Sequence, residues 1–279
     1  MKKNRHDSLY FSWSVSILLC ILLAVFALGF TSCRKSSHKP AETSPAVSET
    51  PSNGDNSSQE SASPSSAAPT SPTGSSEVRL GETDDMGQEY VDKFIFLGDS
   101  TTYGLGYYEI VPKNQIWTPK NGTLTLSLWS TATIVYPEDN SEIPIKEAVE
   151  KAKPEYMLIT LGVNGVSFMD EEYFIKEYTK LVQTIQEASP NTKIILNSIY
   201  PIGKNYPASN GITNEKIDKA NTWVERIASS TGVKYLDSES VLKGSDGALV
   251  ESYHNGDSMH LNADSFKLVI NYLRTHGYK

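Results

Sequence analysis

The sequence contains three short polar groups whose residue types suit nucleophilic catalysis. A serine hydroxyl becomes a nucleophile when a histidine takes its proton and a carboxylate orients the imidazole. Ser100 provides a hydroxyl, and Asp257 stands three residues before His260, a spacing that allows the carboxylate to orient the ring. Asn164 adds an amide that can donate a hydrogen bond to an oxyanion. The three groups are Gly98-Asp99-Ser100, Gly162-Val163-Asn164 and Asp257-Ser258-Met259-His260.

Each group also has a structural interpretation that the sequence leaves open. Aspartate and serine are common helix caps, and an asparagine such as Asn164 suits a turn. His254 also has Asp257 three residues away and is a rival base, whereas His276 stands near the chain end and is expected to be solvated. No second histidine stands at metal-ligand spacing among free carboxylates, so we expect no catalytic metal.

The elements around these groups predict a parallel α/β domain. Strands are expected over four apolar runs, and a weaker alternation over Leu124–Leu128 predicts a further strand. Apolar residues at three- and four-residue spacing predict the intervening helices, the last of them capped by Asn262. Strands that alternate with helices imply a parallel sheet with right-handed crossovers, whose ligands bind at the carboxyl ends of the strands. The four runs are Lys93–Leu97, Tyr156–Leu161, Lys193–Ile199 and Lys234–Leu236, and the helical patterns are Phe174–Ile185, Ile217–Ile227 and Phe266–Leu273.

The N-terminal third has the character of an export signal followed by a tether. Lys2, Lys3 and Arg5 precede the uncharged run from Val15 to Phe30, which is shorter than the roughly 20 residues of a spanning helix and suits a secretory signal. The run ends in Leu28-Gly29-Phe30-Thr31-Ser32-Cys33, which resembles a bacterial lipobox. From position 34 to 76, 31 of 43 residues are Ser, Thr, Pro, Ala or Gly, a composition typical of a disordered spacer.

We therefore expect three regions. Residues 1–32 form a lipoprotein-type signal peptide, 33–89 hold the lipidated Cys33 and the linker, and 90–279 form the catalytic domain. An uncleaved anchor with an incidental cysteine is the alternative. Both interpretations place the domain outside the cytoplasmic membrane, either lipid-anchored on the outer face of a bacterial cytoplasmic membrane or secreted. The net charge of −8 argues against a nucleic-acid partner, and the two cysteines, Cys20 and Cys33, leave no disulfide framework in the domain.

The order and placement of the three polar groups resemble the SGNH/GDSL hydrolase family from about Lys93 to Leu273. The resemblance implies a flavodoxin-like three-layer α/β/α sandwich with a parallel central sheet, esterase chemistry and no cofactor. It implies that Ser100 is the nucleophile, His260 the base and Asp257 its orienting residue, with Asn164 and the Ser100 backbone N–H as oxyanion donors. The family's second-block glycine has no counterpart, and we assign its donor role to Ser130 in the segment Trp129-Ser130-Thr131-Ala132. Gly165 stands where an aspartate often follows the family's asparagine, and Thr101 where the original motif has leucine.

We expect a serine esterase that hydrolyses an acyl ester, in particular an O-acetyl ester, on a carbohydrate or other extracellular substrate. The expected partners are an acylated small molecule or glycan and, through the lipid anchor, the membrane. An O-acyltransferase with the same triad is one alternative, because the sequence does not reveal which acceptor the site admits. A non-catalytic glycan-binding surface lipoprotein is another, and the joint presence of serine, histidine, aspartate and asparagine argues against it. A structural tether or adhesin is the third, and no repeat or second module supports it.

Overall fold

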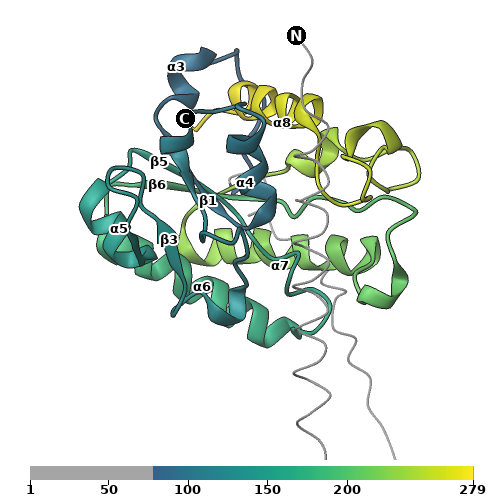
Figure 1. The fold of residues 1–279 in the computed structure, drawn as a ribbon, viewed down its shortest axis with the longest axis horizontal. Coiled ribbons are helices and arrows are strands. Elements are labelled where there is room, and N and C mark those ends of the chain that lie inside the picture. The colour runs from purple at the N-terminus through teal and green to yellow at the C-terminus, as the bar shows by residue number, and fades with distance from the viewer. Residues whose placement is uncertain (1–77, 279) are drawn as a thin grey trace, which may run out of the picture. The chain divides into compact units, whose positions relative to one another are not determined.

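A computed structural model describes residues 78–278, and all structural statements below concern these residues (Figure 1). The predicted signal peptide, Cys33 and most of the linker lie outside the described residues. Just inside them, the backbone N–H of Leu80 donates to the carbonyl of Tyr235 at 2.8 Å, so this segment pairs with the sheet edge. In the described part of the chain, no helix combines the length and hydropathy needed to cross a membrane.

The core is a five-stranded parallel sheet in the order β2-β1-β5-β6-β7. Strand β1 is central to the site: it pairs with β5 from Phe94 opposite Tyr156 to Gly98 opposite Thr160. The four strands expected from apolar runs are confirmed, because strands buried on both faces are apolar throughout. The strands are β1 (Phe94–Gly98), β2 (Ile116–Trp117), β5 (Tyr156–Thr160), β6 (Lys193–Asn197) and β7 (Lys234–Leu236).

The expected strand over Leu124–Leu128 is wrong. Its last three residues form a 3-10 helix, η2 (Leu126–Leu128), and the edge strand that pairs with β1 is Ile116–Trp117 instead. Leu124 and Leu126 are each 1 % exposed, so the alternation correctly reported burial. Burial at every second residue arises in a loop as well as in a strand, and only ladder pairing makes a strand. A separate antiparallel pair follows, β3 (Thr133–Val135) with β4 (Glu142–Pro144).

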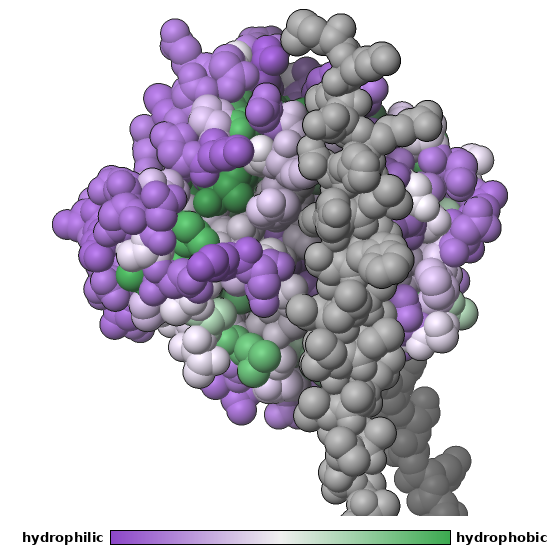
Figure 2. All heavy atoms as spheres, in the orientation of Figure 1, coloured by the Kyte–Doolittle hydropathy of each residue, from purple (hydrophilic) through white to green (hydrophobic). Residues whose placement is uncertain are grey.

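Helices cover both faces of the sheet, which confirms the three-layer α/β/α fold (Figure 1). Along β1, Phe94 and Phe96 pack with α8 on one face, whereas Leu97 packs with α5, α6 and α7 on the other. Helices α4 and α8 lie side by side on the first face, and Asn262 caps α8 as expected. On the view in Figure 2, hydrophobic residues appear only as small separate areas. The helices are α3 (Gly87–Val91), α4 (Ser100–Tyr107), α5 (Ile145–Ala152), α6 (Glu171–Ala188), α7 (Asn214–Thr231) and α8 (Ala263–Thr275), with short 3-10 turns η1 (Lys113–Gln115), η3 (Ala208–Asn210), η4 (Ser238–Val241) and η5 (Glu251–Tyr253).

Candidate active site

The turn between β1 and α4 holds Ser100 at the carboxyl edge of the sheet. Gly98 is required there, since a Cβ on it would lie 2.5 Å from the carbonyl oxygen of Thr160 on the neighbouring strand. Asp99 is the N-cap of α4, and its carboxylate accepts from the Thr101 backbone N–H at 3.0 Å. Ser100 is therefore the first residue of the helix, where backbone N–H groups lack intrahelical acceptors and favour negative charge.

The structure brings Ser100, His260 and Asp257 together in one hydrogen-bonded series. Ser100 Oγ lies 2.9 Å from His260 Nε2, and His260 Nδ1 lies 2.6 Å from Asp257 Oδ2. The second oxygen of Asp257 accepts the backbone N–H groups of Met259 and His260, each at 2.8 Å. The carboxylate thus fixes both its own loop and the imidazole ring. A series with this geometry can carry a proton from the serine hydroxyl to the imidazole.

Gly203 and His254 hydrogen-bond to the backbone of the loop that carries Asp257 and His260. Ser258 has φ +63°, a left-handed conformation that costs a non-glycine residue energy. The Gly203 N–H donates to the Ser258 carbonyl at 2.7 Å, and a Cβ on Gly203 would lie 3.0 Å from that of Ser258. His254 Nδ1 accepts from the N–H groups of Gly256 and Ser258 at 3.0 and 3.3 Å. The rival histidine therefore braces the loop, while His260 contacts Ser100.

Charges and hydrogen bonds within the series shift the pKa values of His260 and Asp257. Burial lowers the pKa of His260, but the hydrogen bond and charge of Asp257, helped by the charge of Asp99, outweigh it and raise that pKa above 6.5. Burial raises the pKa of Asp257, yet its hydrogen bonds and the charge of His260 hold the value below 3.8. The imidazolium form is thereby stabilised beside an ionised carboxylate, as proton abstraction from a serine requires.

Asp99 is an unexpected member of the site. Its side chain is fully buried, and desolvation raises its pKa to about 6 despite hydrogen bonds from Thr101. One oxygen accepts from the N–H and Oγ1 of Thr101, and the other accepts from Asn164 Nδ2 at 3.0 Å. Asn164 Nδ2 also donates to the Leu124 carbonyl at 3.3 Å. The amide expected to face an oxyanion is therefore fixed by a buried carboxylate on one side and a loop carbonyl on the other.

Leu124 is a loop residue found beside Asn164. Ser130 is exposed, and its assignment as an oxyanion donor stays a prediction. Sequence reasoning missed Leu124 and Gly203, and it treated Asp99 only as a cap. The glycine at Gly122, two residues before Leu124, was the available signal that this loop departs from a strand.

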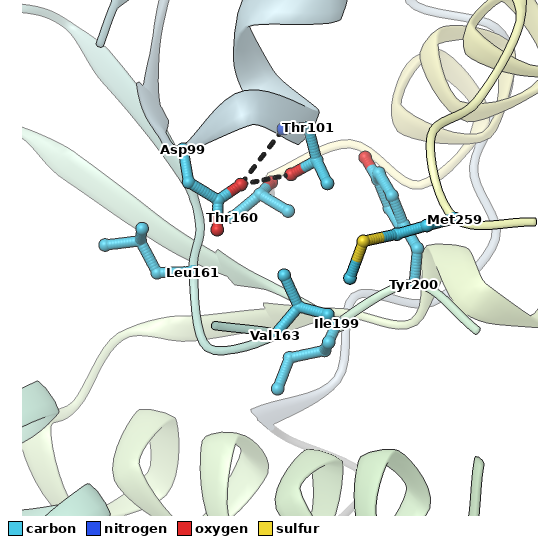
Figure 3. Close-up of a pocket in the computed structure, with 8 residues that line it drawn as sticks. All are labelled: Asp99, Thr101, Thr160, Leu161, Val163, Ile199, Tyr200 and Met259. Atoms are coloured by element: carbon cyan, nitrogen blue, oxygen red, sulfur yellow. Dashed lines mark hydrogen bonds between the residues drawn. The ribbon is translucent and has the colours of Figure 1, made fainter. Parts of the chain in front are cut away.

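A small cavity of about 10 Å³ is lined in part by the sequence neighbours of Ser100 and His260 (Figure 3). Asp99 and Thr101, which flank Ser100 in the sequence, line one side, and Met259, next to His260, lines another. Among the described residues, no group of three or more His, Cys, Asp or Glu side chains is arranged to share a metal ion. The remaining lining residues are Thr160, Leu161, Val163, Ile199 and Tyr200.

A parallel α/β sandwich that sets a serine, a histidine and an aspartate in series at its carboxyl edge is the architecture of an α/β serine hydrolase. The model of the GDSL-like lipase/acylhydrolase family matches residues 96–268, which include all three side chains. This chain belongs to that family and is a carboxylic ester hydrolase.

Two solved structures with a TM-score of 0.50 show the same fold at low sequence identity. A protein from Streptococcus pneumonia described as a platelet activating factor has a TM-score of 0.50 and 18% identity, covering 65% of this chain and 82% of its own. A DUF4886 family protein from Bacteroides uniformis has a TM-score of 0.50 and 13% identity, with 67% and 83% covered. An acetyl-xylooligosaccharide esterase from Geobacillus has a TM-score of 0.42 and 20% identity, with 67% and 94% covered. The search of curated proteins finds no match.

Proposed function

We propose that Ser100 is the nucleophile of a two-step hydrolysis of O-acetyl esters on an extracellular carbohydrate. Ser100 Oγ attacks the ester carbonyl as its proton passes to His260 Nε2, and the imidazolium then protonates the departing sugar alkoxide. Water, deprotonated by His260, attacks the acetyl-serine and releases acetate, which restores the hydroxyl. The observation that carries this proposal is the hydrogen-bonded series, with 2.9 Å from Ser100 to His260 and 2.6 Å from His260 to Asp257.

The oxyanion formed at each step is stabilised by the Ser100 backbone N–H and the Asn164 amide. Both hydrogens of Asn164 Nδ2 are engaged before substrate arrives. The bond to the Leu124 carbonyl, at 3.3 Å, is the longer and goes to a neutral acceptor, so the oxyanion takes this hydrogen and leaves the bond to Asp99 in place. Ser130 remains our assignment for a third donor. An amide already oriented in this way stabilises the transition state with little reorganisation.

The small cavity that Asp99 and Thr101, the sequence neighbours of Ser100, help to line supports a short acyl group. Its free space of about 10 Å³ is small, so a group the size of a methyl suits it better than a longer chain. Val163, Ile199 and Met259 supply apolar walls. We therefore assign acetyl as the acyl group, and we expect longer acyl chains to be excluded.

A labelling experiment combined with a chain-length series tests this function. A fluorophosphonate probe should label Ser100 in the wild type, as located by peptide mass spectrometry, and should leave Ser100→Ala unlabelled. Hydrolysis of 4-nitrophenyl esters should fall by at least about tenfold in kcat/KM from acetate to butyrate and further to octanoate. Labelling at another serine would refute the nucleophile, and a preference for octanoate would refute the acetyl assignment. An assay that contains a sugar acceptor separates hydrolysis from acyl transfer. Hydrolysis releases free acetate, whereas transfer yields the acetylated acceptor.

We further propose that the enzyme acts at the cell surface, anchored by a lipid on Cys33. The lipobox-like sequence before Cys33 and the Ser/Pro-rich spacer after it support this location. Expression of the full chain with a radiolabelled fatty acid in a bacterial host should label the wild type and not Cys33→Ser. Equal labelling of the two would refute the lipid anchor.

A further inference from the structure

Two exposed tyrosines follow the nucleophile along one side of α4. Tyr103 and Tyr107 stand three and seven residues after Ser100, the spacing at which helix residues share a face. Their exposed fractions are 39% and 53%, although both lie on a helix whose other side is packed in the core. Each turn of the helix adds about 5.4 Å along its axis, so the two rings lie progressively farther from the reacting hydroxyl.

The rings of Tyr103 and Tyr107 lie beside one another on the surface of α4. Their centroids are 6.3 Å apart at an interplanar angle of 29°. Rings in full face-to-face contact would approach to about 3.5–4.0 Å, so neither ring covers the other. We refer to Tyr103 and Tyr107 together as the tyrosine platform.

The tyrosine platform is braced from the side of the catalytic loop. The ring of Tyr108 meets that of Tyr107 edge-on at 5.0 Å and packs against Phe266 of α8 at 6.1 Å. Tyr108 also forms a side-chain hydrogen bond with Asn255, two residues before Asp257. The platform is thus held by the same loop that positions the catalytic carboxylate, which keeps it in a defined place relative to the ester.

On its other side the platform adjoins a polar hollow. A Cβ on Gly122 would lie 3.9 Å from the Tyr103 ring, so the loop around Gly122 lies against this tyrosine. The neighbours of Gly122, Asn121 and Thr123, line a hollow of about 500 Å³. Its other lining side chains are mostly polar as well: Lys120, Thr131, Thr133 and Glu142, together with Pro119 and Ala132. Hydroxyl and amide groups of this kind suit the hydroxyls of a sugar.

We propose that the tyrosine platform binds the sugar rings next to the acetylated unit, so that the substrate is a chain of pyranose units and not a single acetylated sugar. This inference rests on the proposed function. A tyrosine ring offers a flat apolar face to the C–H face of a pyranose and a hydroxyl to its rim, at a low cost in side-chain entropy. The platform begins one turn from Ser100, so a ring bound on Tyr103 belongs to a unit adjacent to the ester.

The test compares a small ester with two acetylated oligosaccharides. Wild type, Tyr103→Ala, Tyr107→Ala and the double variant are assayed on 4-nitrophenyl acetate, on acetylated xylotetraose and on an O-acetylated tetramer of N-acetylglucosamine. The two tetramers distinguish a plant glycan from a wall-type glycan. We expect each single variant to raise KM for the preferred tetramer about tenfold and to keep kcat/KM for 4-nitrophenyl acetate within about twofold.

Two further variants serve as controls. Tyr103→Phe tests whether the ring is sufficient without its hydroxyl, and Tyr173→Ala tests whether the loss of an exposed tyrosine elsewhere has the same effect. Tyr103→Phe retains the ring and should keep KM within about threefold of wild type. Tyr173→Ala removes a tyrosine with the same 39% exposure from α6, which covers the opposite face of the sheet, and should leave every KM unchanged. An equal rise in KM for this control would overturn the platform.

The outcomes separate the platform from the proposed function. Cleavage of a tetramer by wild type and by the platform variants with the same KM would overturn the platform and leave the esterase assignment standing. Cleavage of 4-nitrophenyl acetate without cleavage of either tetramer would overturn both the glycan substrate and the platform. An equal loss on all three substrates would show that the tyrosines support α4, and it would likewise overturn the platform.

Discussion

Asp99→Asn is the most informative substitution that the structure suggests. The carboxylate is fully buried, bonds Thr101 through one oxygen and Asn164 through the other, and lies next to the nucleophile in sequence. An asparagine has nearly the same shape and can still accept from Thr101 through its oxygen. Its amide nitrogen then faces Asn164 Nδ2. Both groups are hydrogen-bond donors, whereas in the wild type Asn164 Nδ2 donates to a carboxylate oxygen of Asp99. The substitution breaks one specific contact and leaves the packing unchanged.

The effect on stability should be small because two large contributions oppose each other. Raising the pKa of Asp99 from 3.8 to about 6 means that the charged form costs about 3 kcal/mol at neutral pH. Asparagine removes that cost. It also forfeits the charged hydrogen bond from Asn164, worth about 1.5–3 kcal/mol, and weakens the bonds from Thr101. We expect the free energy of unfolding at pH 7.5 to change by less than about 2 kcal/mol.

The pH dependence of stability isolates the carboxylate. A buried carboxyl whose pKa is raised binds a proton more tightly in the folded state, so its contribution to stability is lost as pH rises from about 4 through 6. Asp257 titrates in both proteins and largely cancels in the difference, whereas the pKa of His260 is itself raised by the charge of Asp99 and adds its own contribution. Urea unfolding at pH 4 and at pH 7.5 should therefore show wild type losing about 2.4 kcal/mol relative to Asp99→Asn across this range.

Activity should fall although stability does not. Without its charged acceptor, Asn164 loses the contact that orients its amide, and removing an oxyanion donor altogether costs about 10²–10³ in kcat. We expect kcat for 4-nitrophenyl acetate to fall about 10- to 100-fold, with KM little changed. The charge of Asp99 also raises the pKa of His260, so the acid limb of the pH profile should move to lower pH in the variant. A kcat within twofold of wild type together with an unmoved acid limb would refute this reasoning.

Three further outcomes follow from the site. His260→Ala should lower kcat by about 10³ or more and the double variant with Ser100→Ala should be little worse, whereas His254→Ala should retain most activity and lose stability; the reverse result would make His254 the base. Wild-type kcat/KM should fall as pH drops through a midpoint above 6.5, because protonated His260 cannot accept the serine proton, and a flat profile from pH 5 to 8 would contradict a histidine base. Asn164→Ala should lower kcat about 10²–10³ with little change in KM; a loss of thermal stability alone would indicate a turn role.

The sheet could be predicted because its strands are buried on both faces. Phe94 and Phe96 face one helical layer and Leu97 the other, so the run is apolar throughout. The same reasoning failed at Leu124–Leu128, where two buried leucines belong to a loop. The hydropathy of each residue indicates whether it is buried. Strand formation also requires hydrogen bonds to a second segment, which the sequence of one segment does not reveal. The edge strand Ile116–Trp117 is too short to show a period of its own.

The predicted site residues met because their elements end at one edge of the sheet. Ser100 follows β1 and Asn164 follows β5, and these strands are neighbours. The contact between Ser100 and His260 spans 160 residues and depends on the α8 entry loop. The sequence offered two histidines at the same distance from Asp257, and the structure places the ring of His260 against Ser100 while His254 accepts backbone N–H groups of the loop. A three-residue spacing limits what an aspartate can reach but does not say in which direction the loop turns.

The geometry around Asn164 explains why a buried charge is retained beside the nucleophile. A neutral acceptor at position 99 would fold at least as well, because the ionised carboxylate costs about as much as its hydrogen bonds return. What the charge adds is a fixed direction for the Asn164 amide and a stabilised imidazolium on His260. Both matter only when negative charge develops on the substrate and positive charge on the ring. In the proposed mechanism, Asp99 therefore contributes little to the folded ground state and most to the transition state, which is where an interaction increases kcat.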